Sequence, residues 1–214
     1  MRQAYFITGI GTGVGKTLIS AMLTEALEAD YWKPIQAGFE DGTDAGSVSK
    51  WISDPAGRIG DEVYKLTMPA SPHIAAREEG IDISLEKIKS EYERLCSISD
   101  RPLIIEGAGG LLVPLNETQT MLDLIIKLDI PVIIVSRNYL GSINHSLLTA
   151  KMLEQAGATV LGWVFNDQFM DYEKEISAWT KLPILGSVPF QDNPGKEFII
   201  EQAALMKPVL KKSI

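Results

Sequence analysis

The sequence predicts an α/β fold in which a mostly parallel sheet is covered by helices on both faces. Apolar runs of strand length alternate with amphipathic runs of helix length along the chain. Several of the apolar runs are continuous, which is typical of strands that are buried on both faces. The first of them leads through a glycine-rich turn directly into a helix. We therefore expect one three-layer domain over residues 1–214.

The composition supports a globular domain and limits the kinds of partner that we expect it to bind. Hydrophobic residues make up 45% of the 214 residues and charged residues 22%, enough for a large core. The net charge of -8 argues against a nucleic-acid-binding surface. Two histidines and one cysteine cannot form a Cys/His zinc cluster. No apolar run approaches the 18 residues that span a bilayer, and no signal peptide is evident, so we expect a cytoplasmic protein without nucleic-acid or membrane partners.

The first strand, residues 4–7, is followed by TGIGTGVGKT, residues 8–17, and by a helix. Glycines let backbone N–H groups surround phosphate oxygens, Lys16 adds a charge that reaches the β and γ groups, and Thr17 offers a hydroxyl to Mg²⁺. The spacing departs from G-x-x-x-x-G-K-[ST], because Ile10 stands where glycine is required. The alternative is a glycine-rich turn without a ligand. We favour a nucleoside triphosphate site and a P-loop NTPase-like fold.

The next segment, YWKPIQAG at residues 31–38, predicts a short strand ended by Pro34. Lys33 then lies at the carboxyl end of a strand, which faces the ligand crevice in open parallel sheets. At that position we expect Lys33→Ala to lower turnover with little loss of folding stability. Residues 39–44 predict a loop, with Thr43 or Asp44 capping a helix over 45–52. Asp44 is therefore either a helix cap or a metal ligand.

Residues 53–83 are the least regular part of the chain. They contain a possible edge strand at 62–66 and a turn at 71–73 that enters a short helix. His73 in this turn is either a general base or a solvated or capping residue. A following amphipathic helix over 84–96 begins with Ser84 as its N-cap.

The segment RPLIIEGAGGLLVPL, residues 101–115, predicts a buried strand that ends at Glu106 and a glycine-rich turn. In P-loop proteins an acid at such a strand end holds Mg²⁺. The alternative is a carboxylate that caps the turn.

The rest of the chain continues the alternation. Helices are expected over 121–128, 142–155, 171–181 and 195–206, and strands over 131–136, 160–166 and 183–190. Gly157 is expected to stop the second of these helices. Right-handed crossovers would place Lys33, Glu106 and Asn166 along the sheet edge of the glycine-rich turn.

The segments TGIGTGVGKT, KPIQAG, TDAGS, SPH, EGAGGLLVPL, LGSINH and GWVFND occur in the order found in dethiobiotin synthetases, which the chain resembles over nearly its whole length. The resemblance implies a homodimeric, ATP-dependent C–N ligase of biotin biosynthesis. It would close the ureido ring of dethiobiotin from 7,8-diaminopelargonic acid, CO₂ (or bicarbonate) and Mg-ATP.

The resemblance also implies residue roles. Lys16 and Lys33 would be catalytic, stabilising a carbamate and the transferred phosphoryl group, and Thr17, Asp44 and Glu106 would hold Mg²⁺. The nucleotide would contact Thr12, Gly13, Val14, Gly15, Lys16, Thr17, Leu18, Asp44, Glu106, Gly107, Ala108, Gly109, Asn166, Asp167, Pro189, Phe190 and Gln191. The substrate would contact Thr12, Lys33, Ala37, Leu140, Gly141, Ser142, Ile143 and Asn144, with its carboxylate received across the dimer interface by the segment 140–144.

The chain departs from the family pattern at two positions. Ala37 stands where Ser or Thr is common, and Gly13 where glutamate is frequent. A nucleotide-binding homologue that has lost activity is therefore an alternative. Partitioning or septum-placing switch ATPases are another, although their loop begins with a lysine at the position of Gly11. A glutamine-dependent amidotransferase would need a glutaminase domain, for which no residues remain.

Overall fold

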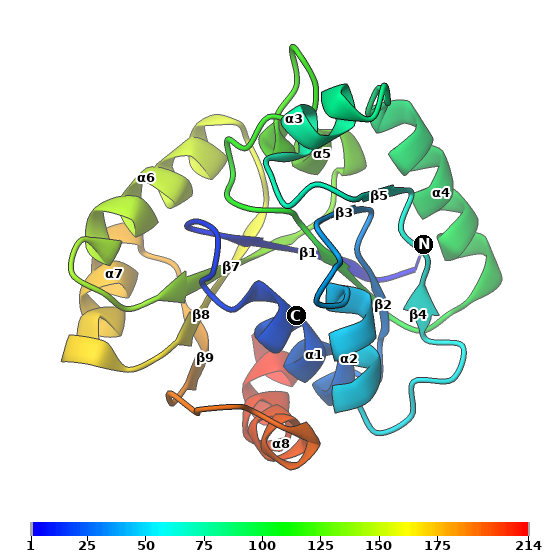
Figure 1. Cartoon of the computed structure of the whole chain (residues 1–214). Coiled ribbons are helices and arrows are strands. Elements are labelled where there is room, and N and C mark those ends of the chain that lie inside the picture. Colours follow the sequence, from blue (N-terminus) through cyan, green and yellow to red (C-terminus); the bar gives the residue numbers. More distant parts are fainter. Residues whose placement is uncertain (1, 214) are drawn as a thin grey trace.

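The computed structural model describes residues 2–213 and places a parallel sheet between two layers of helices (Figure 1). The seven-stranded sheet has the order β4-β2-β6-β1-β7-β8-β9, and each neighbouring pair is parallel. Its strands are β1 (Ala4–Gly9), β2 (Asp30–Trp32), β4 (Ile59–Gly60), β6 (Leu103–Glu106), β7 (Val132–Arg137), β8 (Val160–Asn166) and β9 (Ile184–Val188). A separate two-stranded sheet pairs β3 (Ile35–Ala37) with β5 (Tyr64–Leu66). The predicted fold class is confirmed.

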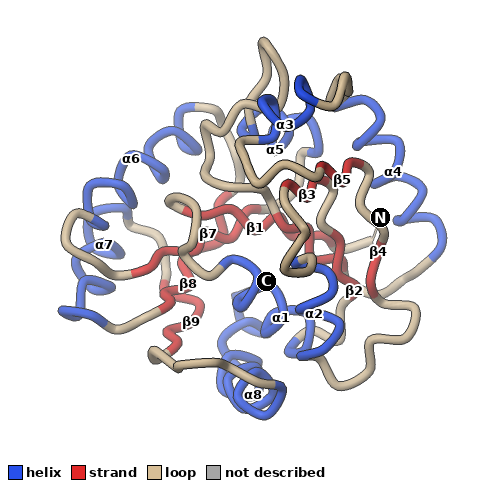
Figure 2. The backbone as a smooth tube through the Cα atoms, in the orientation of Figure 1, coloured by secondary structure: helices blue, strands red, loops and turns tan. Residues whose placement is uncertain are grey.

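The helices form the outer layers, and Figure 2 shows them in blue on both sides of the red strands. The helical segments are α1 (Lys16–Ala26), α2 (Asp44–Trp51), α3 (Pro72–Glu78), α4 (Leu85–Ile98), α5 (Met121–Leu128), α6 (Ser142–Gln155), a 3₁₀ turn η1 (Phe169–Asp171), α7 (Tyr172–Thr180) and α8 (Lys196–Ser213). In the described part of the chain, no helix combines the length and the apolar character needed to cross a bilayer.

Successive side chains along the central strands point to opposite faces of the sheet, and this divides the core into two halves. In β1, Phe6 packs in the cluster under α4 and α5, whereas its neighbours Tyr5 and Ile7 pack in the cluster under α1 and α8. Successive side chains of a strand point to opposite faces, so a strand that is apolar at every position buries both faces. The continuous apolar runs of the sequence are explained in this way.

Some elements differ from the prediction. The strand expected at 62–66 does form, as β5, and it pairs with β3 in the small sheet, whereas the edge strand β4 of the main sheet was not predicted. Backbone N–H groups of Val63 and Tyr64 both donate to the carbonyl of Pro34, which holds β5 beside β3. The last helix continues to Ser213 through Pro208, because Met206 and Leu210 on both sides of the proline stay buried.

The predicted helix starts agree better with the structure. The hydroxyl of Thr43 accepts a hydrogen bond from the N–H of Gly46, so Thr43 is the N-cap of α2 and Asp44 is its first residue. Ser84 caps α4 in the same way, and Gly157 follows α6 with a left-handed φ of 75°.

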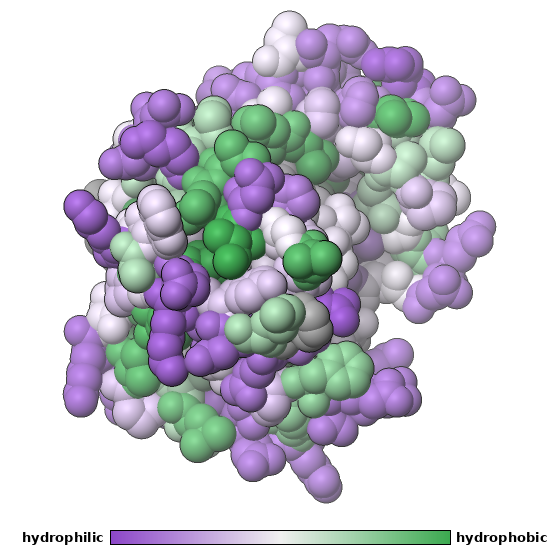
Figure 3. Space-filling view, turned by 90° about the vertical axis from the view of Figure 1, so that its left-hand side faces the viewer, coloured by the Kyte–Doolittle hydropathy of each residue, from purple (hydrophilic) through white to green (hydrophobic). Residues whose placement is uncertain are grey.

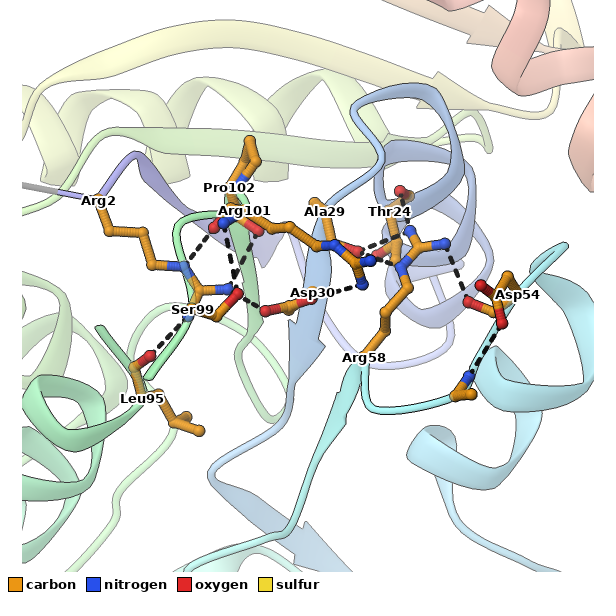
Figure 4. Close-up of polar contacts among 11 residues, drawn as sticks. Arg2, Thr24, Ala29, Asp30, Asp54, Arg58, Leu95, Ser99, Arg101 and Pro102 are labelled. Carbon is orange, nitrogen blue, oxygen red and sulfur yellow. Dashed lines mark hydrogen bonds and ion pairs between the residues drawn. The ribbon is translucent and has the colours of Figure 1, made fainter. Parts of the chain in front are cut away.

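Buried arginines fix the end of β2 that is farther from the glycine-rich turn, as Figure 4 shows. Arg58 donates from Nη2 to the carbonyls of Ala29 at 2.7 Å and Thr24 at 2.8 Å, and from Nε to Ala29 at 2.9 Å. Arg2 forms an ion pair with Asp30, the first residue of β2. These contacts join the α1–β2 turn, β4 and the amino terminus of the chain. They hold β2, which leads directly to Lys33.

Candidate active site

The glycine-rich turn connects β1 to α1 and is tied to the end of β8. Gly13 and Gly15 have φ values of 73° and 92°, in the left-handed region that favours glycine. A Cβ on Gly15 would also lie 2.1 Å from Nδ2 of Asn166, which donates to the carbonyl of Val14 at 3.0 Å. A Cβ on Gly13 would meet no atom within 4 Å. Backbone conformation, and not lack of space, therefore favours glycine at position 13.

Lys16 is buried at the start of α1, and its Nζ donates to the carbonyl of Gly11 at 2.8 Å. Burial lowers the pKa of Lys16 to about 8, although the nearby Glu106 carboxylate opposes this shift. The ammonium group thus lies inside the loop that would surround a phosphate. Without a bound phosphate it holds its proton weakly.

Lys33 lies between two carboxylates that come from different elements. Its Nζ is 2.6 Å from Oδ2 of Asp44 on α2 and 3.0 Å from Oε1 of Glu106 at the end of β6. Burial alone would lower the pKa of Lys33, but Glu106 and Asp44 outweigh burial and the pKa is raised. Lys33 is therefore a charged ammonium that is only 5% exposed. This burial removes the basis for expecting that Lys33→Ala leaves stability nearly unchanged.

Glu106 is 1% exposed and both of its oxygens are engaged. Oε1 accepts from the Thr17 hydroxyl at 2.9 Å as well as from Lys33, and Oε2 accepts from the Tyr31 hydroxyl at 2.9 Å. Burial, then the charge of Glu106, raises the pKa of Tyr31 well above its usual value, so the phenol stays protonated. Tyr31 was not predicted as a site residue, since nothing in the local pattern DYWK shows that its ring points toward β6.

A cavity of about 730 Å³ brings most of the predicted site residues together. It is lined by Thr12, Gly13, Gly15, Lys16, Thr17, Lys33, Ala37, Asp44, Glu106, Ala108 and Gly109. It is also lined by Gln36, Pro69, Ala70, Ser71, Pro72 and Val113, which were not predicted as site residues. Gln36 and the Ser71-Pro72 pair lie within the motifs KPIQAG and SPH, so the sequence did hold a signal for them. His73 lies beside the cavity lining, with Nδ1 3.1 Å from Oγ of Ser71.

A second cavity of about 410 Å³ also borders the glycine-rich turn and shares Thr12 and Gly13 with the larger one. Its wall is formed by residues 11–14, by residues 137–140 at and after the end of β7, and by Asp167. Nε of Arg137 is 3.6 Å from Oδ2 of Asp167 across it. Leu140, Val14 and Asp167 of the predicted site are therefore here and not in the larger cavity.

The remaining predicted residues lie outside both cavities. Pro189, Phe190 and Gln191 follow β9, next to Asp167, whose N–H donates to the carbonyl of Val188 at 2.9 Å. Leu18 packs partly buried along α1, and Gly107 lies where a Cβ would be 2.9 Å from the Phe6 ring. The segment Gly141, Ser142, Ile143 and Asn144 forms the start of α6, and Asn144 faces a groove between α6 and α7.

The donor set around Lys33 fits Mg²⁺. Thr17, Asp44 and Glu106 offer one hydroxyl and two carboxylates, the hard oxygen ligands that Mg²⁺ prefers. Among the described residues no group of three His, Cys, Asp or Glu side chains lies close enough to hold a metal. Mg²⁺ usually completes its coordination with water and phosphate oxygens, so a few protein ligands suffice.

A phosphate-cradling loop on a parallel sheet, with buried lysines and acids at the same edge, defines the class of P-loop nucleotide-binding α/β proteins. The MinC:MinD cell division complex of Aquifex aeolicus is similar in fold, with a TM-score of 0.60 and 16% identity over 99% of this chain and 97% of that one. A family model described as an AAA domain matches residues 3–197.

Relatives with much higher sequence identity are ATP-dependent dethiobiotin synthetases, called BioD. The protein of Cytophaga hutchinsonii is 51% identical over 164 residues, 77% of each chain, and that of Christiangramia forsetii is 44% identical over 189 residues, 88% of each. The chain belongs to the ATP-dependent dethiobiotin synthetase family. The resemblance stated from the sequence motifs is confirmed, and the likeness to MinD is one of fold.

Proposed function

We propose that the chain forms dethiobiotin from 7,8-diaminopelargonic acid, CO₂ and Mg-ATP, releasing ADP and phosphate. The observation that supports this most is the buried Lys33, held between Asp44 and Glu106 in the cavity that also contains Lys16. A site built to bind nucleotide alone does not require a second buried ammonium beside the loop lysine. Two ammonium groups suit a reaction whose intermediates accumulate negative charge.

The reaction has three steps. One amine of the diamine attacks CO₂ and loses a proton, which gives a carbamate anion. A carbamate oxygen attacks the γ-phosphorus of ATP and ADP leaves, which gives a carbamic-phosphoric anhydride. The second amine attacks the carbonyl carbon, phosphate leaves, and loss of a proton completes the ring.

In this scheme the two lysines neutralise charge where it develops. Lys33 lies at the carboxyl edge of the sheet and would bind the carbamate, whereas Lys16 would bind the phosphoryl group in transfer. Ala37 lines the same cavity without a hydroxyl, so the substrate would be held there by packing and by Thr12, which also lines the cavity.

Thr17, Asp44 and Glu106 would hold Mg²⁺, which supplies charge neutralisation on the phosphates. The role of this chain is then to hold the three oxygen donors at one place. Lys33 does so by its contacts to both carboxylates, and Thr17 by its hydrogen bond to Glu106.

The nucleotide would lie over the glycine-rich turn, with its base toward the ends of β8 and β9. The residue pair Asn166 and Asp167 and the segment 189–191 are brought together there by the Asp167 to Val188 backbone hydrogen bond. Leu18, Gly107 and Ala108 would complete the contacts around the triphosphate.

We also propose that the active unit is a homodimer. Leu140 before α6 is 85% exposed, and the exposed Leu148 and Trp179 lie beside a groove of about 690 Å³ between α6 and α7. Figure 3 shows apolar residues gathered on the side of the molecule that contains these helices. A second copy on this face would bring its own segment 140–144 to the cavity of the first copy that contains Lys33. The start of helix α6 in that segment would suit the substrate carboxylate. The need for ATP supports a cytoplasmic location.

Phosphate release from Mg-ATP with bicarbonate, measured with and without 7,8-diaminopelargonic acid, tests the proposal. We expect release to depend on the diamine. Equal release in its absence would identify an ATPase of another kind, and nucleotide binding without any turnover would identify a homologue that has lost activity.

A further inference from the structure

Tyr31 has a place in the site that the lysines and acids do not explain. Its hydroxyl donates to Oε2 of Glu106 at 2.9 Å, while the other donors, Thr17 and Lys33, contact Oε1. We propose that Tyr31 is a positioning residue that fixes the plane of the Glu106 carboxylate for the metal. This inference rests on the proposed function, in which Glu106 holds Mg²⁺.

The position of the Tyr31 hydroxyl is set by the backbone. Tyr31 pairs with Ile104 in the parallel register of β2 and β6, and its fully buried ring packs in the core under α1. Along β6, Glu106 is two residues beyond Ile104 and points to the same face. The ring spans this distance, so its hydroxyl meets the carboxylate from the side of β2.

The strand that presents Tyr31 is itself held firmly. Its first residue, Asp30, is paired with Arg2, and the carbonyl of Ala29, just before the strand, accepts two hydrogen bonds from Arg58 (Figure 4). Lys33 follows Tyr31 by two residues. The strand β2 and the residue that follows it therefore supply a donor to Oε2 and a donor to Oε1 of the same carboxylate.

Loss of the hydroxyl would free one side of the carboxylate. The terminal torsion of a glutamate is broad, so an oxygen without its donor can rotate away from the geometry that a metal requires. Removing a hydrogen-bond partner of a metal ligand typically weakens metal affinity 10- to 100-fold, even though the partner never touches the metal.

Tyr31→Phe tests this directly, because it keeps the ring and removes only the hydroxyl. Tyr5→Phe is a matched control: Tyr5 pairs with the same Ile104 from the other side of β6 and packs in the same core half. Mn²⁺ binding to the protein–ADP complex, measured by electron paramagnetic resonance, is the readout. We expect Tyr31→Phe to weaken Mn²⁺ binding about tenfold, and Tyr5→Phe to bind it as the natural chain does.

Two further measurements separate positioning from general damage. Affinity for ADP without metal should be the same in both variants, and turnover of Tyr31→Phe should rise toward that of the natural chain at high Mg²⁺. A fold defect would lower the metal-free affinity and would not respond to Mg²⁺. Equal Mn²⁺ affinity in Tyr31→Phe and Tyr5→Phe would overturn the inference.

Glu106→Gln distinguishes failure of this inference from failure of the metal site. If Glu106→Gln keeps the Mn²⁺ affinity of the natural chain, the assignment of Glu106 as a metal ligand is wrong and the Tyr31 proposal falls with it. If Glu106→Gln loses Mn²⁺ while Tyr31→Phe retains it, the metal site stands and only the role of Tyr31 is rejected.

Discussion

Lys33 is both a structural and a chemical residue. Its ammonium compensates two carboxylates, one of which is almost completely buried, and it also lines the cavity where a carbamate would form. A buried charge is tolerated only when it is paired, and removal of one partner leaves the other without compensation. Stability and activity are therefore linked at this position.

Lys33→Met should lower the free energy of unfolding by about 3 kcal/mol and abolish turnover. Urea denaturation and diamine-dependent phosphate release measure the two effects. Lys50→Met, which alters an exposed lysine at the other end of α2, is the control and should change neither. A Lys33→Met protein with the stability of the natural chain would show that the ion pairs do not stabilise the fold.

The lowered pKa of Lys16, about 8, predicts proton uptake when ATP binds. In the free protein at pH 9, roughly nine-tenths of Lys16 would be neutral, and the phosphate charge would restore the proton. At pH 6.5 the residue is already charged and takes up none. Calorimetric titration with ATP, in buffers of different ionisation enthalpy, should therefore show nearly one proton taken up at pH 9, accompanied by weaker binding. Equal proton uptake at the two pH values would contradict this account of Lys16.

Among the elements, the turn between β1 and α1 depends on glycine for two separate reasons. Gly15 has a left-handed φ of 92°, and it leaves room for the Asn166 amide that ties the turn to β8. Gly11 has neither constraint. Its φ is not in the left-handed region, and a Cβ there would meet no atom within 4 Å.

Gly15→Ala should lower the free energy of unfolding by about 2 kcal/mol through backbone strain and displacement of Asn166. Gly11→Ala is the matched control and should leave stability nearly unchanged. Thermal unfolding of both variants without nucleotide measures the difference. Equal melting temperatures would mean that the turn adapts to a side chain at Gly15 without strain.

The sequence predicted helices and strands well where the residue pattern was local and extended over many residues. Continuous apolar runs indicated β1, β6, β7 and β8, and cap residues such as Ser84 indicated helix starts. It missed β4, and although it indicated a strand at 62–66 it did not show the pairing with β3, because two or three residues give no periodicity and their pairing depends on partners distant in the chain. The Tyr31 to Glu106 contact was missed for the same reason, since it joins residues that are 75 apart.

At the scale of the whole molecule, parallel topology explains why separate motifs form one site. β2, β6 and β1 are neighbours in the sheet, so Lys33, Glu106 and the glycine-rich turn meet at their carboxyl ends. This part of the site could be predicted from chain order alone. The division into two cavities could not, because it depends on the side chains of residues 137–140 and 69–72.

Leu148→Glu should convert the proposed dimer to monomers and lower turnover, because a charge would be buried in the α6–α7 face. Leu205→Glu on α8, a similarly exposed leucine elsewhere on the surface, is the control and should remain dimeric and active. Sedimentation velocity and the phosphate assay report the two effects. A natural chain that is monomeric at working concentration and fully active would contradict the proposed interface.

Ring closure itself is tested most directly by isotope transfer from bicarbonate. With ¹³C-bicarbonate, 7,8-diaminopelargonic acid and Mg-ATP, we predict a dethiobiotin product with a single ¹³C atom in the ureido carbonyl and one phosphate released for each product, as mass spectrometry and phosphate assay would detect. Phosphate release without labelled product would contradict the account.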